Sequence, residues 1–230
     1  HRRALVCQGR EDALAALEAR DPRRLLTGTA DSRDARVAFL FPGLGNHHVG
    51  MARDLYREEP RFREILDECA DLLTPELGLD LRKTLFPEGL SPLSRGAGAG
   101  EGVNLRALLG RGAAQESPAE AEAARRLRRT ELAQPAVFAV EYALARLLQE
   151  LGLRPEALLG FSVGEYVAAC LSGVFALGDA MRLVARRAKM IAELPTGAML
   201  AVPLAEVEAG RLAGMELSIA ALLGPELTVG

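Results

Sequence analysis

The sequence predicts an α/β protein in which a mainly parallel sheet is flanked by helices and followed by a smaller α+β unit. Two apolar runs have the character of buried strands that end at turns: RVAFLFPG at 36–43 and EALLG at 156–160. Between and after them, apolar residues recur every three to four positions, which is the spacing of helices. Strands that alternate with helices in this way are typical of a parallel sheet covered by helices.

The first half of the chain shows further elements in order. RRALVC at 2–7 predicts a strand, REDALAALEAR at 10–20 predicts a helix, and TGTADSRDA at 27–35 predicts a polar linker. Apolar positions follow a helical spacing from 51 to 73, where Pro60 predicts a break between two helices. The segment 89–120 is rich in Gly, Ala, Ser and Pro and can bury little, so we expect a flexible insertion there.

The second half continues the pattern. PAVFAVEYALARLLQELG at 135–152 predicts a helix that begins on a proline, and two more helices are expected in 162–175 and 179–194. GAMLAVPL at 197–204 then predicts a strand, 205–214 a helix, and 215–230 a strand and the start of another. These last elements amount to half of a small α+β subdomain.

Composition excludes several classes of protein. A net charge of −3 leaves no basic face for nucleic acid. Arginines at 125, 126, 128 and 129 predict a solvated helix face, with a docking patch for an acidic partner as the alternative. The three cysteines are far apart, which favours a reducing compartment and argues against a disulfide framework or a metal site. No apolar run has the length of a membrane span and HRRALVCQGR at 1–10 lacks the order of a signal peptide, so we predict a soluble cytoplasmic protein.

A serine between two glycines is the strongest chemical signal. Gly160-Phe161-Ser162-Val163-Gly164 fits G-x-S-x-G, the nucleophile elbow of serine hydrolases and transferases. A sharp strand-to-helix turn lifts the hydroxyl out of the sheet, and the glycines let the backbone pass without Cβ clashes. The alternative is that Ser162 only caps the following helix. A predicted strand before it and a helix after it favour the elbow.

A serine nucleophile needs a base, which is normally a histidine. The three histidines are His1, His47 and His48, and all of them precede Ser162. The base is therefore His47 or His48, or it lies outside these residues. The chain starts with His1 rather than methionine and ends on ELTVG, in the middle of a predicted strand, so we expect a fragment.

Several blocks of sequence resemble malonyl-CoA:ACP transacylases and the acyltransferase domains of modular polyketide and fatty acid synthases. The blocks are FPGLGNHHVGMARDLY at 41–56, TELAQPAVFAVEYALARLL at 130–148, LLGFSVGEYVAACLSGVFALGDAMRLVARRAKMI at 158–191 and GAMLAV at 197–202. The resemblance implies a hydrolase-like α/β core over 36–196 and the start of a ferredoxin-like subdomain over 197–230. Residues 1–28 resemble the end of the linker between a ketosynthase and its acyltransferase.

The resemblance also implies roles for particular residues. Ser162 matches the nucleophile, and the backbone N–H groups of Leu44 and Val163 match the oxyanion hole. Arg187 matches the arginine that binds the substrate carboxylate; from periodicity alone it would be a surface arginine beside Arg186. Three further residues are expected to line the site: Gln134, His47 and Phe161.

The sequence departs from the family pattern at three positions that usually carry polar residues. Leu44 replaces the usual glutamine, Phe161 replaces histidine before the nucleophile, and Leu222 replaces asparagine in an NGP motif. The general-base histidine of the family lies farther downstream than residue 230. Residues 1–230 alone are therefore expected to turn over little or no substrate.

The function implied is ping-pong transfer of a malonyl-type unit from CoA to an acyl carrier protein through a serine ester, in polyketide biosynthesis. TELAQ at 130–134 and the apolar Val163 favour malonyl over methylmalonyl. No bound cofactor or metal is expected, and a neighbouring ketosynthase domain is the expected partner in the same polypeptide. Two alternatives remain: an acyl hydrolase that uses the same elbow, and a non-catalytic domain that docks carrier protein.

Overall fold

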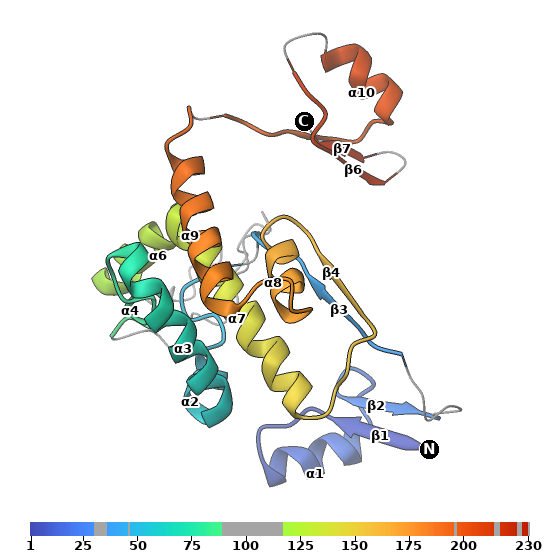
Figure 1. Ribbon diagram of the computed structural model, residues 1–230. Helices are drawn as coiled ribbons and strands as arrows, with labels where there is room; N and C mark the ends of the chain where they lie inside the picture. The colour runs from blue at the N-terminus through green and yellow to red at the C-terminus, as the bar shows by residue number, and fades with distance from the viewer. Residues whose placement is uncertain are drawn as a thin grey trace.

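The computed structural model describes residues 1–29, 36–45, 47–88, 117–195, 197–213, 217–224 and 227–229. A helical core occupies the centre of the molecule, with a two-stranded parallel sheet beside it (Figure 1). An N-terminal unit of two strands and a helix lies at one end. A C-terminal unit of one helix and three short strands stands apart at the end of an extended segment (Figure 1).

Three long helices form the core. They are α3 (Pro60–Leu77), α7 (Thr130–Glu150) and α9 (Leu177–Ala192), and each packs against the other two. Their facing stripes supply large side chains with no exposed surface: Phe62, Leu66, Leu73, Phe138, Met181 and Val184. The 3.6-residue period seen in the sequence therefore has its expected consequence, since the apolar stripe of each helix faces the other two.

Shorter helices complete this layer, and several begin where the sequence provides a cap. They are α2 (Arg53–Glu58), α4 (Leu81–Leu85), α6 (Pro118–Leu127) and α8 (Gly164–Leu171). Helix α3 begins on Pro60, so the predicted break between two helices is confirmed. Asp80 accepts a hydrogen bond from the Arg82 backbone N–H at 3.0 Å and caps α4.

The prediction of an insertion over 89–120 is wrong at its end. Ser117 accepts a hydrogen bond from the Glu120 backbone N–H at 3.1 Å, and Pro118 begins α6. A serine cap followed by a proline at the first helical position is a strong helix start, which the composition of the segment concealed. Residues 89–116 lie outside the described part of the chain.

The prediction that the long helix starts at Pro135 is also wrong. Helix α7 starts five residues earlier, at Thr130, and carries Pro135 inside it. A proline there leaves the Glu131 carbonyl without its usual donor. The first turn is nevertheless helical, because the backbone N–H groups of Leu132 and Ala133 bond to the Arg129 carbonyl at 3.0 and 2.9 Å and both side chains are buried.

The central sheet is smaller than predicted. In the described residues it consists of β3 (Ala38–Phe41) and β4 (Ala157–Gly160), paired in parallel from Ala38 opposite Ala157 to Phe41 opposite Gly160. One face is buried through Phe39 and Phe41, whereas Leu40 and Leu159 on the other face are 67% and 62% exposed. The run at 36–43 was predicted to be a buried strand, which holds for only one face of β3.

The N-terminal unit adds a strand that the sequence analysis did not predict. Strand β1 (Arg2–Leu5) pairs antiparallel with β2 (Leu25–Gly28), and α1 (Arg10–Ala19) connects them. Within this unit, Arg24 forms an ion pair with Asp12 of α1 at 2.6 Å and donates a hydrogen bond to the Val6 carbonyl at 3.0 Å. The predicted linker 27–35 therefore begins inside β2, and its residues 30–35 are not among those described.

The C-terminal unit follows the predicted order of strand, helix and two strands. It contains β5 (Ala201–Val202), α10 (Glu206–Ala213), β6 (Ala221–Gly224) and β7 (Leu227–Val229), and β7 pairs antiparallel with both other strands. Among the helices that the structure describes, none combines the length and apolar character that a membrane span requires.

Candidate active site

Ser162 occupies a strained turn between β4 and α8. Strand β4 ends at Gly160 and helix α8 begins at Gly164, and Ser162 between them has a φ of 55°. A non-glycine residue in this left-handed region costs of the order of 1–3 kcal/mol, so the surrounding structure must impose it. The side chain is exposed, as a nucleophile must be. This is the geometry that the G-x-S-x-G spacing predicts.

Backbone hydrogen bonds hold the turn in place. The Phe161 N–H donates to the Phe41 carbonyl at the end of β3 at 2.9 Å. The Gly164 N–H then donates to the Phe161 carbonyl at 3.0 Å, and the Glu165 N–H donates to the Ser162 carbonyl at 3.2 Å. The serine is thus fixed by the sheet on one side and by the first turn of α8 on the other.

The two glycines of the elbow leave no room for a side chain. A Cβ on Gly160 would lie 2.2 Å from the Glu165 nitrogen, and one on Gly164 would lie 2.1 Å from the Phe41 carbonyl oxygen. Both obstacles are backbone atoms, which cannot rotate away. The glycine spacing is therefore a steric requirement of this turn.

The residues predicted to form the oxyanion hole flank the serine. Leu44 lies in the turn after β3. Val163 directly follows Ser162 and is the residue just before the first residue of α8; its side chain is fully buried. Within the described ranges, the backbone N–H of neither residue has a hydrogen-bond acceptor. Two free N–H groups beside a serine, one of them at a helix N-terminus, suit a developing negative charge.

Gly43 shapes this first turn. It has a φ of 74°, and a Cβ on it would lie 2.6 Å from the Phe161 carbonyl oxygen. Its N–H donates a hydrogen bond at 3.0 Å to Oε1 of Glu141, a residue in the middle of α7. The turn that carries Leu44 is therefore attached both to the elbow and to the helical core.

Arg187 on α9 contacts two residues from neighbouring helices. Its guanidinium donates a hydrogen bond to Oε1 of Gln134 on α7 and lies over the ring of Tyr166 on α8, 5.5 Å from the centroid. Gln134 is buried, and its amide donates to the Thr130 hydroxyl at 2.7 Å, which fixes the amide orientation. The structure thus brings together Arg187 and Gln134, two of the residues predicted to line the site.

Arg187 forms no ion pair with the acidic residues that the structure describes. Its side chain is half-buried. Tyr166 lies in the first turn of α8, the helix that directly follows the elbow of Ser162. The Arg187 guanidinium therefore lies beside the start of that helix. The neighbouring Arg186 is exposed. A guanidinium without a carboxylate partner suits an anionic ligand.

Three further residues named in the sequence analysis lie in three different segments of the chain. His47 is half-buried in the loop after β3, and its Nδ1 is shut off from solvent without a hydrogen-bond partner. Burial, reinforced by the neighbouring His48, lowers the pKa of His47, while a hydrogen bond with the Leu127 backbone opposes that shift. Phe161 is 59% exposed beside the serine, and Leu222 is 51% exposed on β6 in the C-terminal unit.

Tyr166, Thr130 and Glu141 were not predicted as site residues. Tyr166 and Thr130 make the contacts that hold Arg187 and Gln134. Glu141 carried a signal in the sequence, since it is the one charged residue within the apolar stretch PAVFAVEYALA. Tyr166 contacts Arg187 across two separate helices, which leaves no comparable signal in the sequence. Thr130 bonds to Gln134 within α7, four residues apart, which is the spacing of one helical turn.

Glu141 also makes stability depend on pH. Burial raises the pKa of its carboxyl above the ordinary 4.5, while the hydrogen bond from Gly43 works in the opposite direction. The folded state then binds more protons than the unfolded state, so this residue lowers the free energy of unfolding as pH rises from about 4.5 through the raised pKa. The glutamine in Glu141→Gln does not titrate. The free energy of unfolding of this variant should therefore increase relative to that of the wild type as pH rises over that range. Urea denaturation at several pH values measures the difference; a constant difference would contradict the prediction.

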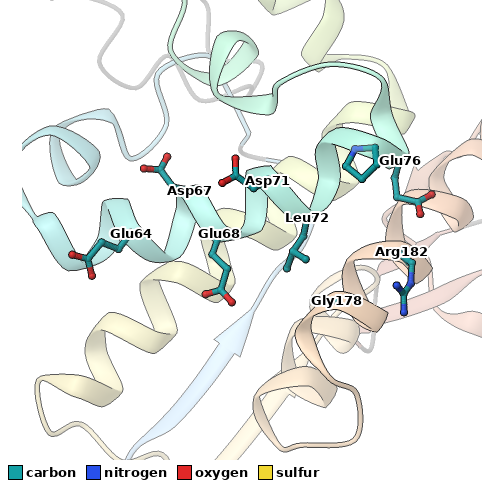
Figure 2. A pocket seen from close by; sticks show the side chains of 9 residues that line it. Glu64, Asp67, Glu68, Asp71, Leu72, Glu76, Gly178 and Arg182 are labelled. Atoms are coloured by element: carbon teal, nitrogen blue, oxygen red, sulfur yellow. The ribbon is translucent and has the colours of Figure 1, made fainter.

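A separate cleft in the described residues is acidic. It has a volume of about 760 Å³ and lies between α3 and α9. Figure 2 shows carboxylates along α3, with Arg182 of α9 across from them. Five acidic side chains line it: Glu64, Asp67, Glu68, Asp71 and Glu76. They would repel the phosphates of CoA, so size alone does not identify the substrate site.

Within the described ranges, no group of three or more His, Cys, Asp or Glu residues is placed to hold a metal ion.

The strained serine between a strand and a helix defines a class of protein: one with the nucleophile elbow that serine hydrolases and transferases share. The chain belongs to the acyl transferase domain family, which it matches over residues 38–229. The family predicted from the sequence blocks is therefore confirmed.

The similar curated proteins are polyketide synthases. The chain is 36% identical over 234 residues to a phenolphthiocerol/phthiocerol polyketide synthase of Mycobacterium tuberculosis, covering 96% of this chain and 13% of that protein. It is 39% identical over 232 residues to the spectinabilin polyketide synthase system protein NorB of Streptomyces orinoci, covering 97% and 9%. The chain thus spans about a tenth of the length of these relatives.

Solved structures show the same fold. The acyl transferase domain of ZmaA superposes with a TM-score of 0.80 at 35% identity, covering all of this chain and 48% of that one. The acyltransferase domain from the second module of the salinomycin polyketide synthase gives 0.71 at 34%, covering 99% and 47%. MCAT from Streptococcus pneumoniae gives 0.60 at 31%, covering 84% and 53%. The fold is that of polyketide synthase acyltransferases, and the chain spans about half the length of these structures.

Proposed function

We propose that this chain is the acyltransferase part of a polyketide synthase and loads a malonyl-type extender unit from CoA onto an acyl carrier protein. The observation that carries the proposal is Ser162, held exposed at a φ of 55° between two sterically required glycines. The family match supports acyl transfer as the reaction. The malonyl unit, the carrier protein and an adjacent ketosynthase are the finer parts of the proposal.

The reaction would proceed in two displacements. The Ser162 hydroxyl attacks the thioester carbonyl, its proton passes to a general base, and the C–S bond breaks to release CoA as the thiol. The phosphopantetheine thiol of the carrier protein then attacks the serine ester and takes the acyl group. In both steps the negative oxygen of the tetrahedral intermediate is stabilised by the N–H groups of Leu44 and Val163. We propose that this base is the histidine of the family pattern.

Substrate selection would rest on Arg187. The malonyl carboxylate can form a bidentate pair with this guanidinium, which has no carboxylate partner in the described part of the chain. A plain acyl chain would leave this half-buried charge unpaired, which disfavours its binding. The hydrogen bond to Gln134 and the stacking on Tyr166 hold the guanidinium in place for that pairing.

Replacing Arg187 with alanine should therefore change selectivity more than reactivity. We expect kcat/KM for malonyl-CoA to fall about 100-fold, the value of a charge-assisted bidentate contact, while acetyl-CoA changes by less than about threefold. Arg187→Lys should lie between, because lysine keeps the charge without the planar fork. Arg186→Ala, one residue away on the exposed side, is the matched control. Equal losses for both substrates would contradict a carboxylate-binding role.

The alternatives differ in what they do with the serine ester. Hydrolysis would release free malonate with no need for a carrier protein. The apolar residues Leu44, Phe161 and Leu222, at positions where the family pattern has polar ones, favour a docking domain that loads nothing. Acyl transfer is the better-supported interpretation, because the strained serine, its free N–H groups and the unpaired Arg187 are all present.

A further inference from the structure

We infer that Glu141 is a positioning residue for the oxyanion hole: its carboxylate holds the Gly43–Leu44 turn so that the Leu44 N–H points at the reacting carbonyl oxygen. This inference rests on the proposed acyl-transfer function. It assigns a role to a side chain on α7 that lies 98 residues from the turn along the sequence.

The contact that carries the inference is a single charge-assisted hydrogen bond. The Gly43 N–H donates to Oε1 of Glu141 at 3.0 Å. Gly43 immediately precedes Leu44 and has a positive φ of 74°. This torsion helps to set the angle between two consecutive peptide units: the first carries the Gly43 N–H, and the second carries the Leu44 N–H. Fixing the first peptide unit therefore orients the second.

The other side of the turn is fixed by contact with the elbow. A Cβ on Gly43 would lie 2.6 Å from the Phe161 carbonyl oxygen and 3.2 Å from a methyl of Val163. The turn thus lies directly against the residues on both sides of Ser162. Glu141 supports it from the helical core, so that the two N–H groups of the hole are held at a fixed separation.

Packing alone does not explain a carboxylate at this position. Glu141 is half-buried, its Oε2 is shut off from solvent without a hydrogen-bond partner, and no cation pairs with it among the described ion pairs. The preceding residues of the helix from Ala136 to Ala139 are apolar and buried. An unpaired buried oxygen destabilises the fold, and such local costs concentrate at functional sites.

The hydrogen bond from Gly43 to Glu141 also determines which N–H groups are available to the substrate oxygen. Because Glu141 occupies the Gly43 N–H, that donor is not available to the substrate, whereas the Leu44 N–H has no acceptor among the described residues. Without the carboxylate, the peptide unit before Gly43 can rotate, and the two N–H groups would no longer be held toward one oxygen. Transition-state stabilisation would suffer, whereas substrate binding through Arg187 would not.

Two variants of the full-length protein separate the roles. Glu141→Gln keeps a carbonyl oxygen for the Gly43 N–H, and Glu141→Leu keeps the approximate volume without an acceptor. Tyr142→Phe, on the next residue of α7, controls for general perturbation of the helix. Far-UV circular dichroism and urea denaturation establish that each variant is folded.

Two reactions of Ser162 are then measured: single-turnover loading from malonyl-CoA, and labelling by a fluorophosphonate, whose phosphoryl oxygen enters the oxyanion hole. We expect Glu141→Leu to slow both maximal rates about 30- to 100-fold, with the KM for malonyl-CoA within about threefold of the wild type. This is at or below the lower end of the roughly 100- to 1,000-fold loss found when an oxyanion donor is removed, because here the donor is displaced and not deleted. Glu141→Gln and Tyr142→Phe should stay within about threefold on both rates.

The two reagents distinguish failure of the inference from failure of the proposed function. If the wild type labels with the fluorophosphonate but takes no malonyl unit, the substrate assignment fails, and slow labelling of Glu141→Leu still supports the positioning role. If folded Glu141→Leu reacts as fast as Glu141→Gln with the fluorophosphonate, the inference is overturned. A rise in KM with an unchanged maximal rate would also overturn it.

Discussion

Acyl loading should be lost when Ser162 is replaced by alanine. The hydroxyl is the only group at the elbow that can form the ester, so we expect the rate of transfer from malonyl-CoA to a carrier protein to fall by about 10⁴-fold or more. The fold should survive, because alanine removes one exposed oxygen from a residue whose conformation is imposed by backbone hydrogen bonds. Transfer is followed by mass spectrometry of the carrier protein.

Ser172→Ala is the matched control for this experiment. Ser172 ends the same helix, α8, and its hydroxyl donates to the Ala168 carbonyl at 2.8 Å. We expect its transfer rate to be unchanged within about twofold. If Ser162→Ala retained most of the activity, the nucleophile would be another residue and the elbow would be only a helix start.

A second large effect is expected from adding one methyl group at Gly164. Its Cβ would lie 2.1 Å from the Phe41 carbonyl oxygen and 2.8 Å from the Phe41 Cβ, so that α8 must move away from β3. We expect Gly164→Ala to lower the free energy of unfolding by about 3 kcal/mol or more, at the upper end of overpacking effects. Urea denaturation of the purified variant measures this.

Gly178→Ala tests whether the effect belongs to the elbow rather than to glycine replacement in general. A Cβ on Gly178, in the first turn of α9, would meet only the Leu72 side chain, at 3.9 Å. Alanine is the better helix former, so this variant should be as stable as the wild type or more stable by up to about 1 kcal/mol. Similar destabilisation in both variants would contradict the steric account of the elbow.

The elbow could be predicted from sequence because its determinants are local. The strand before Ser162, the helix after it and the flanking glycines all lie within 157–171, and the structure places them as expected. The helix break at Pro60 and the strand–helix–strand order after residue 197 were predictable for the same reason. Local chemistry decides where such elements begin and end.

What failed depends on contacts between distant segments. The start of α7 at Thr130 passes through Pro135 because packing of Leu132 and Ala133 in the core outweighs one missing hydrogen bond. The exposed Leu40 and Leu159 show that an apolar run does not reveal which face of a strand is covered.

Only some residues of the candidate site could be named from the sequence, and none of their contacts could be. Arg187 stood out from Arg186 only through resemblance to the family, and the contacts with Gln134 and Tyr166 now give it a physical setting. Glu141 is 98 residues from the turn it supports, a separation at which a sequence pattern carries no information about contact. Its isolated charge in an apolar helix was the one available clue.

The most direct test of the account uses the full-length protein mixed with equal amounts of malonyl-CoA, methylmalonyl-CoA and acetyl-CoA, with intact mass and peptide mapping as the readout. We expect a single malonyl adduct on the peptide that contains Ser162, and no such adduct in Ser162→Ala. An acetyl adduct in preference to malonyl would contradict selection of a carboxylate by Arg187. Intact acyl-CoA with no adduct on Ser162 would contradict the central claim that this serine accepts the acyl group.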